Sequence, residues 1–111
     1  MPRDATRQDP SMSVVRHVPE ASRFELWEDD ELAGYVDYDR RGDVWELPHT
    51  RIFDRFGGRG LGHTLVLETL EQIATAGGSV IPSCPFIPQV MVGDPELVAL
   101  VPADKRRRYG L

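Results

Sequence analysis

The chain has 111 residues, of which 41% are hydrophobic and 28% charged, and its formal net charge is −5. This length predicts a single domain that buries its own hydrophobic core. The negative net charge argues against a dedicated nucleic-acid-binding protein. No stretch approaches the roughly 20 apolar residues of a membrane span, and the polar start lacks a signal-peptide core, so we expect a cytoplasmic protein with no membrane partner. The single cysteine, Cys84, excludes an internal disulfide bond.

The two ends of the chain differ in composition from its middle. Residues 1–12 are polar and contain two prolines, which predicts a disordered segment. We expect the folded domain to span residues 13–104, followed by a basic tail at 105–111 that reads KRRRYGL. Such a tail is typically solvated and frayed, and contact with RNA or another anion is the alternative.

Four short runs with β-strand character follow one another at residues 13–18, 23–28, 32–39 and 43–53. The segments between them, PEAS, DDE and RRGD, are rich in turn-forming residues. Connections this short predict an antiparallel meander. Pro48 interrupts the fourth run. Because proline cannot donate to a strand ladder, we expect a bulge, a sheet edge or a departure from the neighbouring strand there.

The clearest helical pattern covers residues 60–76, and a glycine pair is expected to end it. Its apolar stripe consists of Leu61, Leu65, Val66, Leu70, Ile73 and Ala74. A fifth, buried strand is expected at residues 79–86, ended by its second proline, Pro85. Two weaker helical segments are expected around residues 87–92 and 95–101.

The junction between the fourth strand and the main helix is rich in glycine, since residues 57–62 read GGRGLG. The free N–H groups and the dipole of a helix N-terminus favour an anion at such a junction. A P-loop would need a lysine after the glycines, and a dinucleotide fingerprint would need an acidic residue on the next strand; the sequence has neither. Two interpretations of this junction remain: a pyrophosphate site for coenzyme A, and a tight turn that binds no ligand.

Residues 49–100 contain a series of short motifs. They are His49-Thr50, Gly58-Arg59-Gly60-Leu61-Gly62, Val80-Ile81-Pro82, Cys84-Pro85-Phe86 and Pro95-Glu96. Together these motifs resemble the small YjdJ-like branch of the GNAT N-acetyltransferase superfamily. The glycine motif alone is weak, and its combination with Cys-Pro-Phe makes the resemblance fairly specific. The chain departs from the family pattern at Gly57, His63, Asp94 and Leu97. None of these four removes a backbone N–H, but the tyrosine hydroxyl of the family would be absent near Leu97.

The resemblance implies a minimal GNAT fold of the α+β class: an antiparallel-led mixed sheet with one principal helix and short C-terminal helices. It implies acetyl-CoA as co-substrate and an amine acceptor, either a small molecule or a peptide or protein. In such folds the fourth and fifth strands splay apart around the pantetheine arm, and Pro48 is the expected start of that splay. The residues expected to bind the cofactor, the first three of them through backbone groups, are Arg51, Ile52, Phe53, Gly58, Arg59, Gly60, Leu61, Gly62, His63, Thr64 and Phe86.

Acetyl transfer to an amine requires a base, because the amine must react in its neutral form. His49 is the candidate general base. The alternative is that His49 only makes hydrogen bonds within its strand. Glu46 is a weaker candidate for the base. Cys84 is the second candidate catalytic residue. It could line the acetyl pocket, accept the acetyl group itself, or serve only as a small buried hydrophobe. The histidines and the cysteine lack metal-ligand spacing, so no metal is expected.

We therefore expect an enzyme that transfers an acetyl group from acetyl-CoA to an amine. One alternative is a module that binds coenzyme A without catalysis. Another is an interaction protein in which the glycine loop is only a turn. The sequence leaves the acceptor and the oligomeric state open.

Overall fold

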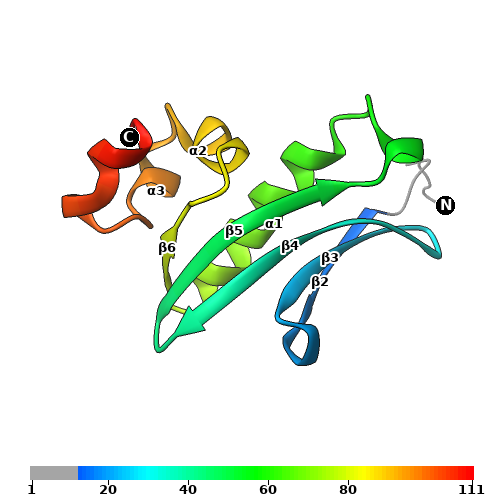
Figure 1. Ribbon diagram of the computed structural model, residues 1–111, viewed down its shortest axis with the longest axis horizontal. Coiled ribbons are helices and arrows are strands. Elements are labelled where there is room, and N and C mark those ends of the chain that lie inside the picture. The colour runs from blue at the N-terminus through cyan, green and yellow to red at the C-terminus, as the bar shows by residue number, and fades with distance from the viewer. Residues whose placement is uncertain (1–12) are drawn as a thin grey trace, which may run out of the picture.

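The computed structural model describes residues 13–111. One five-stranded sheet and one long helix form its two layers (Figure 1). The strands are β2 (Ser13–Val18), β3 (Arg23–Glu28), β4 (Glu31–Arg41), β5 (Val44–Ile52) and β6 (Ser79–Ile81). The helices are α1 (Leu61–Thr75), α2 (Phe86–Met91) and α3 (Pro95–Val98), with 3₁₀ turns η1 (Pro19–Ala21), η2 (Asp54–Phe56) and η3 (Ala103–Tyr109). These elements confirm the expected α+β class and the single principal helix.

The strands lie in the order β2-β3-β4-β5-β6, so sequential strands are neighbours. The first three pairings are antiparallel, which confirms the meander, and β6 joins β5 in parallel. The parallel pairing follows from the connection, because a strand that returns after a helix runs in the same direction as the strand before the helix. In Figure 1 the elements that follow β6 gather on its side of the sheet.

The strand β5 contains a bulge next to Pro48. In its ladder with β4, His49 lies opposite Asp37 and Glu46 lies opposite Asp39. Between these two pairs β4 advances by two residues and β5 by three, so β5 holds one residue more. An extra residue reverses the alternation of side chains between the two faces of a strand. The expected irregularity at Pro48 is therefore confirmed, and it decides which face each later side chain occupies.

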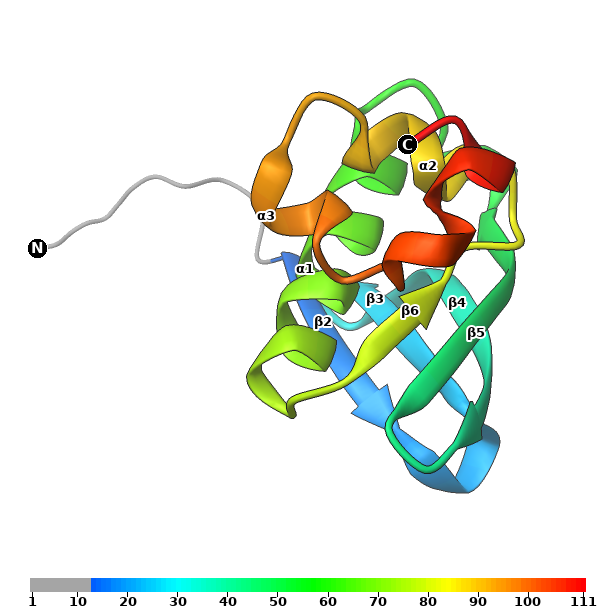
Figure 2. The same cartoon turned by 90° about the vertical axis from the view of Figure 1, so that its left-hand side faces the viewer.

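The core lies between the sheet and α1, which crosses one face of the sheet (Figure 2). Six side chains of α1 are buried there: Leu61, Leu65, Val66, Thr69, Leu70 and Ile73. The expected stripe is correct except that Ala74 is exposed and Thr69 is buried. We call the sheet face that packs against α1 the inner face and the opposite one the outer face.

The C-terminal third differs most from the expectations. The strand β6 ends at Ile81, before Pro82, rather than at Pro85, because each proline removes a backbone donor. The basic segment is not frayed: it forms η3, and the Leu111 N–H donates to the Arg106 carbonyl at 2.9 Å. The side chains of Tyr109 and Leu111 pack against the core. The expected disorder of residues 1–12 lies outside the described residues. No helix within residues 13–111 is long and apolar enough to cross a membrane.

Candidate functional site

The strands β5 and β6 pair over only three residues and then separate. The last pair in register is Glu46 with Ile81. One further bond joins the two segments, from the Cys84 N–H to the Leu47 carbonyl at 2.9 Å. Beyond it the chain after β6 turns into α2, while β5 continues to Ile52. A gap therefore opens along β5 from Pro48 onward, where the sequence predicted the splay to begin.

The register of β5 decides which of its backbone groups face this gap. The Phe53 N–H donates to the Ala33 carbonyl of β4 at 2.9 Å. Hydrogen-bonded and non-hydrogen-bonded pairs alternate along an antiparallel ladder, so Arg51 also bonds to β4. The N–H and C=O groups of Thr50 and Ile52 consequently point away from β4, into the gap.

This register corrects part of the sequence-based prediction. Backbone groups of Arg51, Ile52 and Phe53 were all expected to face the cofactor, and only those of Ile52 do so. The side chains of Arg51 and Phe53 lie together, with the guanidinium carbon 5.1 Å from the ring centroid. Phe53 in turn packs edge-on against Tyr35 of β4, at 6.1 Å between centroids. Thr50, which sequence reasoning placed in a motif but not among the cofactor-binding residues, faces the gap instead.

A cavity of about 300 Å³ lies beside the gap, between β5 and the first residues of α1 and α2. Its lining residues are Thr50, Ile52, Gly62 and Phe86. A Cβ atom on Gly62 would lie 3.3 Å from two atoms of the Phe86 ring, so glycine at this position lets the ring approach the helix closely. The Thr50 hydroxyl oxygen is buried and has no hydrogen-bond partner within residues 13–111.

The glycine loop forms the N-terminal end of α1. Gly58 and Gly60 have φ angles of +77° and +74°, a region that L-residues with side chains rarely adopt. Gly60 is the N-cap residue of α1, and no side chain caps the first turn, which also contains no acidic residue. The first N–H groups of the helix are thus free to bind an anion. His63 is exposed and Thr64 is half-buried on this first turn.

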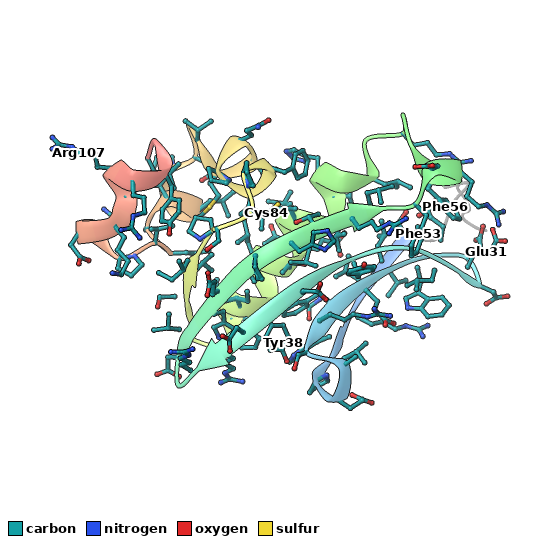
Figure 3. The ribbon with its side chains drawn as sticks, in the orientation of Figure 1. Glu31, Tyr38, Phe53, Phe56, Cys84 and Arg107 are labelled. Atoms are coloured by element: carbon teal, nitrogen blue, oxygen red, sulfur yellow. The ribbon has the colours of Figure 1, made fainter. Side chains whose placement is uncertain are left out.

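Two arginines lie at the glycine loop: Arg55 precedes it and Arg59 is part of it. The ring of Phe56 is buried, with the guanidinium carbons of Arg55 and Arg59 5.0 and 5.5 Å from its centroid. Arg55 also pairs with Glu31, at 3.0 Å between nitrogen and oxygen. Figure 3 shows Phe53 and Phe56 at this end of β5 and Cys84 farther along, between β5 and α2. The loop therefore contains the positive charge of Arg59, whereas that of Arg55 is paired with Glu31.

His49 lies on the outer face of the sheet, opposite the cavity. Its Nδ1 is 3.5 Å from the Asp37 carboxylate, and its ring centroid is 5.9 Å from that of Tyr35. The His49 side chain is 56% exposed. The bulge causes this placement, because it turns Thr50 and Ile52 to the inner face and His49 to the outer one. Glu46 accepts a hydrogen bond from the Ser83 hydroxyl at 2.6 Å.

Cys84 lies at the closed end of the gap. It belongs to the turn between β6 and α2, rather than to a strand as expected. Its N–H bonds to the Leu47 carbonyl, and its carbonyl accepts from the Ile87 N–H at 3.0 Å. The residue is only 8% exposed. Two backbone bonds and burial hold it firmly beside the point where β5 and β6 separate.

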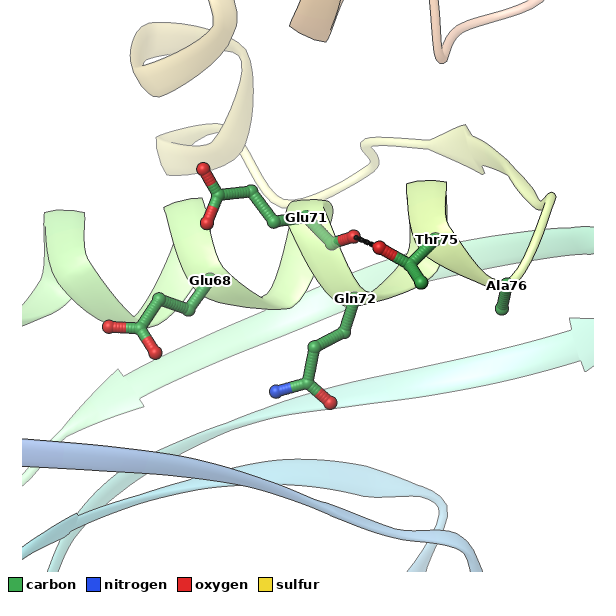
Figure 4. A pocket seen from close by; sticks show the side chains of 5 residues that line it. All are labelled: Glu68, Glu71, Gln72, Thr75 and Ala76. Atoms are coloured by element: carbon green, nitrogen blue, oxygen red, sulfur yellow. Dashed lines mark hydrogen bonds between the residues drawn. The ribbon is translucent and has the colours of Figure 1, made fainter.

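The other cavities share no lining residue with the cavity beside the gap. One of about 380 Å³ lies along α1 and is lined by Glu68, Glu71, Gln72, Thr75 and Ala76 (Figure 4). Partial burial and the neighbouring Glu71 raise the pKa of Glu68, and the Gln72 amide donates to the Val15 carbonyl at 3.0 Å. The carboxylates of Glu68 and Glu71 make this cavity a poor place for an anionic ligand. A cavity of about 460 Å³ lies between α2 and η3.

Most of the predicted site residues thus fall into four places. Ile52, Gly62 and Phe86 meet in one cavity, and the loop 58–62 follows at the start of α1. Cys84 lies at the closed end of the gap, and His49 lies on the opposite face. Thr50 is the residue that sequence reasoning missed, since its orientation depends on the bulge. Within residues 13–111 no group of three or more His, Cys, Asp or Glu side chains is placed to hold a metal ion.

These features match what the resemblance implies for coenzyme A, namely N–H donors for its diphosphate and unpaired strand groups for its arm. Comparison with known proteins supports the resemblance at the level of the superfamily. The sequence model of the GCN5-related N-acetyl-transferase family matches residues 23–100, from the start of β3 to just beyond α3. No curated protein matches the chain. The chain belongs to the GCN5-related N-acetyltransferase family.

Proposed function

We propose that this protein transfers an acetyl group from acetyl-CoA to the nitrogen of an amine, as a member of the small YjdJ-like branch of its family. The observation that carries the proposal is the separation of β5 from β6 after Glu46 and Ile81, in a gap that leads past a cavity to an uncapped helix N-terminus. The family match covers all of these elements.

In this proposal the glycine loop, Gly58 to Gly62, holds the diphosphate through its free N–H groups, with Arg59 beside it. Thr50 and Ile52 pair with the pantetheine arm through the backbone groups that face the gap. The ring of Phe86 forms the opposite wall of the channel. Bound acetyl-CoA supplies an activated acetyl thioester, which the chain positions and shields from water.

His49 acts as the general base, and the acceptor amine approaches from the outer face of the sheet. Support comes from its position two residues beyond Leu47, where the gap begins, and from its exposure to solvent. The Asp37 carboxylate, 3.5 Å from Nδ1, orients the ring so that Nε2 is left for the amine proton. The new C–N bond forms as the thioester C–S bond breaks, the electron pair of that bond leaves with the sulfur as the coenzyme A thiolate, and the amine proton passes to His49.

Cys84 lines the site rather than carrying the acetyl group. Its backbone is fixed by bonds to Leu47 and Ile87, and it is almost fully buried. Cys84 belongs to the hydrophobic core cluster, and a thiol buried in apolar surroundings is a weak nucleophile. Its small apolar side chain instead closes the end of the channel next to the departing sulfur.

A coenzyme-A-binding module without catalytic activity is the second candidate function. The observation that favours it is Leu97, which is 8% exposed and packs in the core, where the resembling family has a tyrosine. Asp94 caps α3 by accepting from the N–H groups of Glu96 and Leu97 at 3.0 and 3.4 Å. No hydroxyl is therefore available there to protonate the leaving thiolate.

Two measurements on the wild-type protein separate these functions. Calorimetric titration with coenzyme A tests binding, and release of free thiol from acetyl-CoA, followed with a panel of small amines and lysine peptides, tests transfer. The proposal expects binding and thiol release that depends on an added amine. Binding without amine-dependent release would support the second function, and no binding would contradict both.

A further inference from the structure

The cavity beside the gap contains one polar side chain, that of Thr50. The other three lining residues, Ile52, Gly62 and Phe86, have no side-chain hydrogen-bonding group. A polar ligand group that enters this space can therefore find a side-chain partner only at Thr50. The N–H and C=O groups of Thr50 face the gap as well, so three hydrogen-bonding groups of one residue lie next to each other.

The Thr50 hydroxyl is buried and unused. Its oxygen has no hydrogen-bond partner within residues 13–111. Buried polar side-chain atoms are usually paired, and an unpaired one reduces the stability of the folded state. Rotation about the Cα–Cβ bond exchanges the hydroxyl with the methyl group. Because the hydroxyl makes no bond, this rotation toward the cavity breaks none.

In the described part of the chain, two other buried polar side-chain atoms share this unpaired state, Trp45 Nε1 and Thr69 Oγ1. Neither residue lines the cavity. Trp45 packs against Gly78, and Thr69 lies inside the buried face of α1. Thr50 is thus distinguished by the combination of an unpaired hydroxyl with a place in the wall of a ligand-sized space.

We infer that the Thr50 hydroxyl donates a hydrogen bond to a carbonyl oxygen of the acylated arm of coenzyme A, which makes Thr50 a specific binding residue for that arm. The inference rests on the proposed function. The arm offers two kinds of carbonyl, its amides and its thioester, and both are acceptors that a hydroxyl can satisfy. The hydroxyl remains unpaired in the free protein because its partner belongs to the ligand.

The test compares Thr50→Val, which replaces the hydroxyl by a methyl group of similar shape, with Thr50→Ser, which keeps the hydroxyl. Thr69→Val is the matched control, since it makes the same change at a buried threonine outside the cavity. Affinities for acetyl-CoA, coenzyme A and 3′-phosphoadenosine 5′-diphosphate, which lacks the arm, are measured by calorimetry. Melting temperatures of the free proteins are measured alongside.

Thr50→Val is expected to bind acetyl-CoA about tenfold more weakly than wild type, because a ligand carbonyl is left unpaired. Its affinity for 3′-phosphoadenosine 5′-diphosphate should not change. Thr50→Ser and Thr69→Val should bind acetyl-CoA within about threefold of wild type. An equal loss with coenzyme A identifies an arm amide as the partner, and a loss confined to acetyl-CoA identifies the thioester.

The free Thr50→Val protein should be at least as stable as wild type, since the hydroxyl has no partner to lose. A lower melting temperature for this variant would overturn the inference, because it would give the hydroxyl a structural role. Equal affinity of wild type and Thr50→Val for both arm-containing ligands would also overturn it and leave the proposed function intact. Absence of coenzyme A binding by wild type would overturn the proposed function and the inference together.

Discussion

His49 and Thr50 are neighbours in the sequence, and their side chains lie on opposite faces of the sheet. Thr50 faces the cavity with Gly62 and Phe86, and His49 faces Asp37 and solvent. In the proposed function the cofactor arm therefore lies on the Thr50 side of β5, and the acceptor amine approaches from the His49 side of the same strand. The bulge beside Pro48 sets this division, because it fixes which face each residue after it occupies.

The glycine loop provides the first prediction. Gly60→Ala should weaken coenzyme A binding at least tenfold, because a Cβ atom there projects into open space where the diphosphate meets the loop. The positive φ of Gly60 adds a conformational cost of about 1 kcal/mol for any other residue. Calorimetry measures the affinity of the folded variant.

Gly42→Ala is the control for that variant. Gly42 also has a positive φ, +62°, and a Cβ atom added to it would have no other atom within 4 Å, but it lies in the hairpin between β4 and β5. The two variants should lose similar stability, and only Gly60→Ala should lose affinity. If both bind coenzyme A as wild type does, the loop does not hold the diphosphate.

The second prediction concerns His49. His49→Ala should lower the rate of acetyl transfer about 100-fold, as expected for loss of a general base. Affinity for coenzyme A should stay the same, because the side chain lies on the face away from the cavity. Steady-state kinetics and calorimetry measure the two quantities. His17→Gln, on the edge strand β2 at the opposite side of the sheet from β6, serves as the control, and wild-type turnover by His49→Ala would remove His49 from the mechanism.

Cys84 provides the third prediction. Its thiol is 8% exposed, so a thiol reagent should label it slowly in the free protein and more slowly still when coenzyme A covers the channel. Cys84→Ser should reduce activity only a few-fold, because the residue lines the site. Mass spectrometry follows the labelling. Loss of nearly all activity together with acetylation of the wild-type thiol would instead make Cys84 the nucleophile.

The fourth prediction concerns His17, which lies on β2, the edge strand at the opposite side of the sheet from β6. Its ring stacks on Phe24 at 4.6 Å between centroids, and its Nε2 lies 2.7 Å from the Tyr38 hydroxyl. Partial burial, and then the Arg40 charge, lower the pKa of His17 below 6.5, against the opposing effect of Glu20. The folded protein therefore binds fewer protons than the unfolded chain between the lowered pKa and 6.5.

The stabilising contribution of neutral His17 is accordingly complete above pH 6.5 and is lost as the pH falls below that value. Melting temperatures between about pH 7.5 and 5.5 should fall more steeply for wild type than for His17→Gln, which cannot take up the proton. Parallel curves for wild type and His17→Gln would show that His17 is equally basic in the folded and unfolded chain.

The regular elements could be predicted from the sequence because local patterns determine them. The strand runs and the main helix were located to within about two residues, since alternation and helical spacing are strong local signals. The fifth strand was predicted too long, because two prolines divide its sequence and the first of them, Pro82, ends it. The basic segment was expected to fray, and tertiary packing of Tyr109 and Leu111 orders it instead.

The candidate site could be predicted only in part. The glycine loop and Phe86 are recognisable from motifs that specify backbone conformation or packing, and Ile52 was predicted from its place on the strand after His49-Thr50. The direction of each backbone group along β5 depends on its register with β4, and one extra residue at the bulge changes it. For that reason Arg51 and Phe53 were assigned to the gap and Thr50 was overlooked.

Amide hydrogen exchange, measured residue by residue with and without acetyl-CoA, tests the central claim most directly. The N–H groups of Thr50 and Ile52 face the gap, whereas those of Arg51 and Phe53 bond to β4. We predict that the first two exchange quickly in the free protein and slowly in the complex, and that the other two exchange slowly in both. Unchanged exchange at Thr50 and Ile52 under saturating acetyl-CoA would contradict the account, because the free edge of β5 would then not hold the arm.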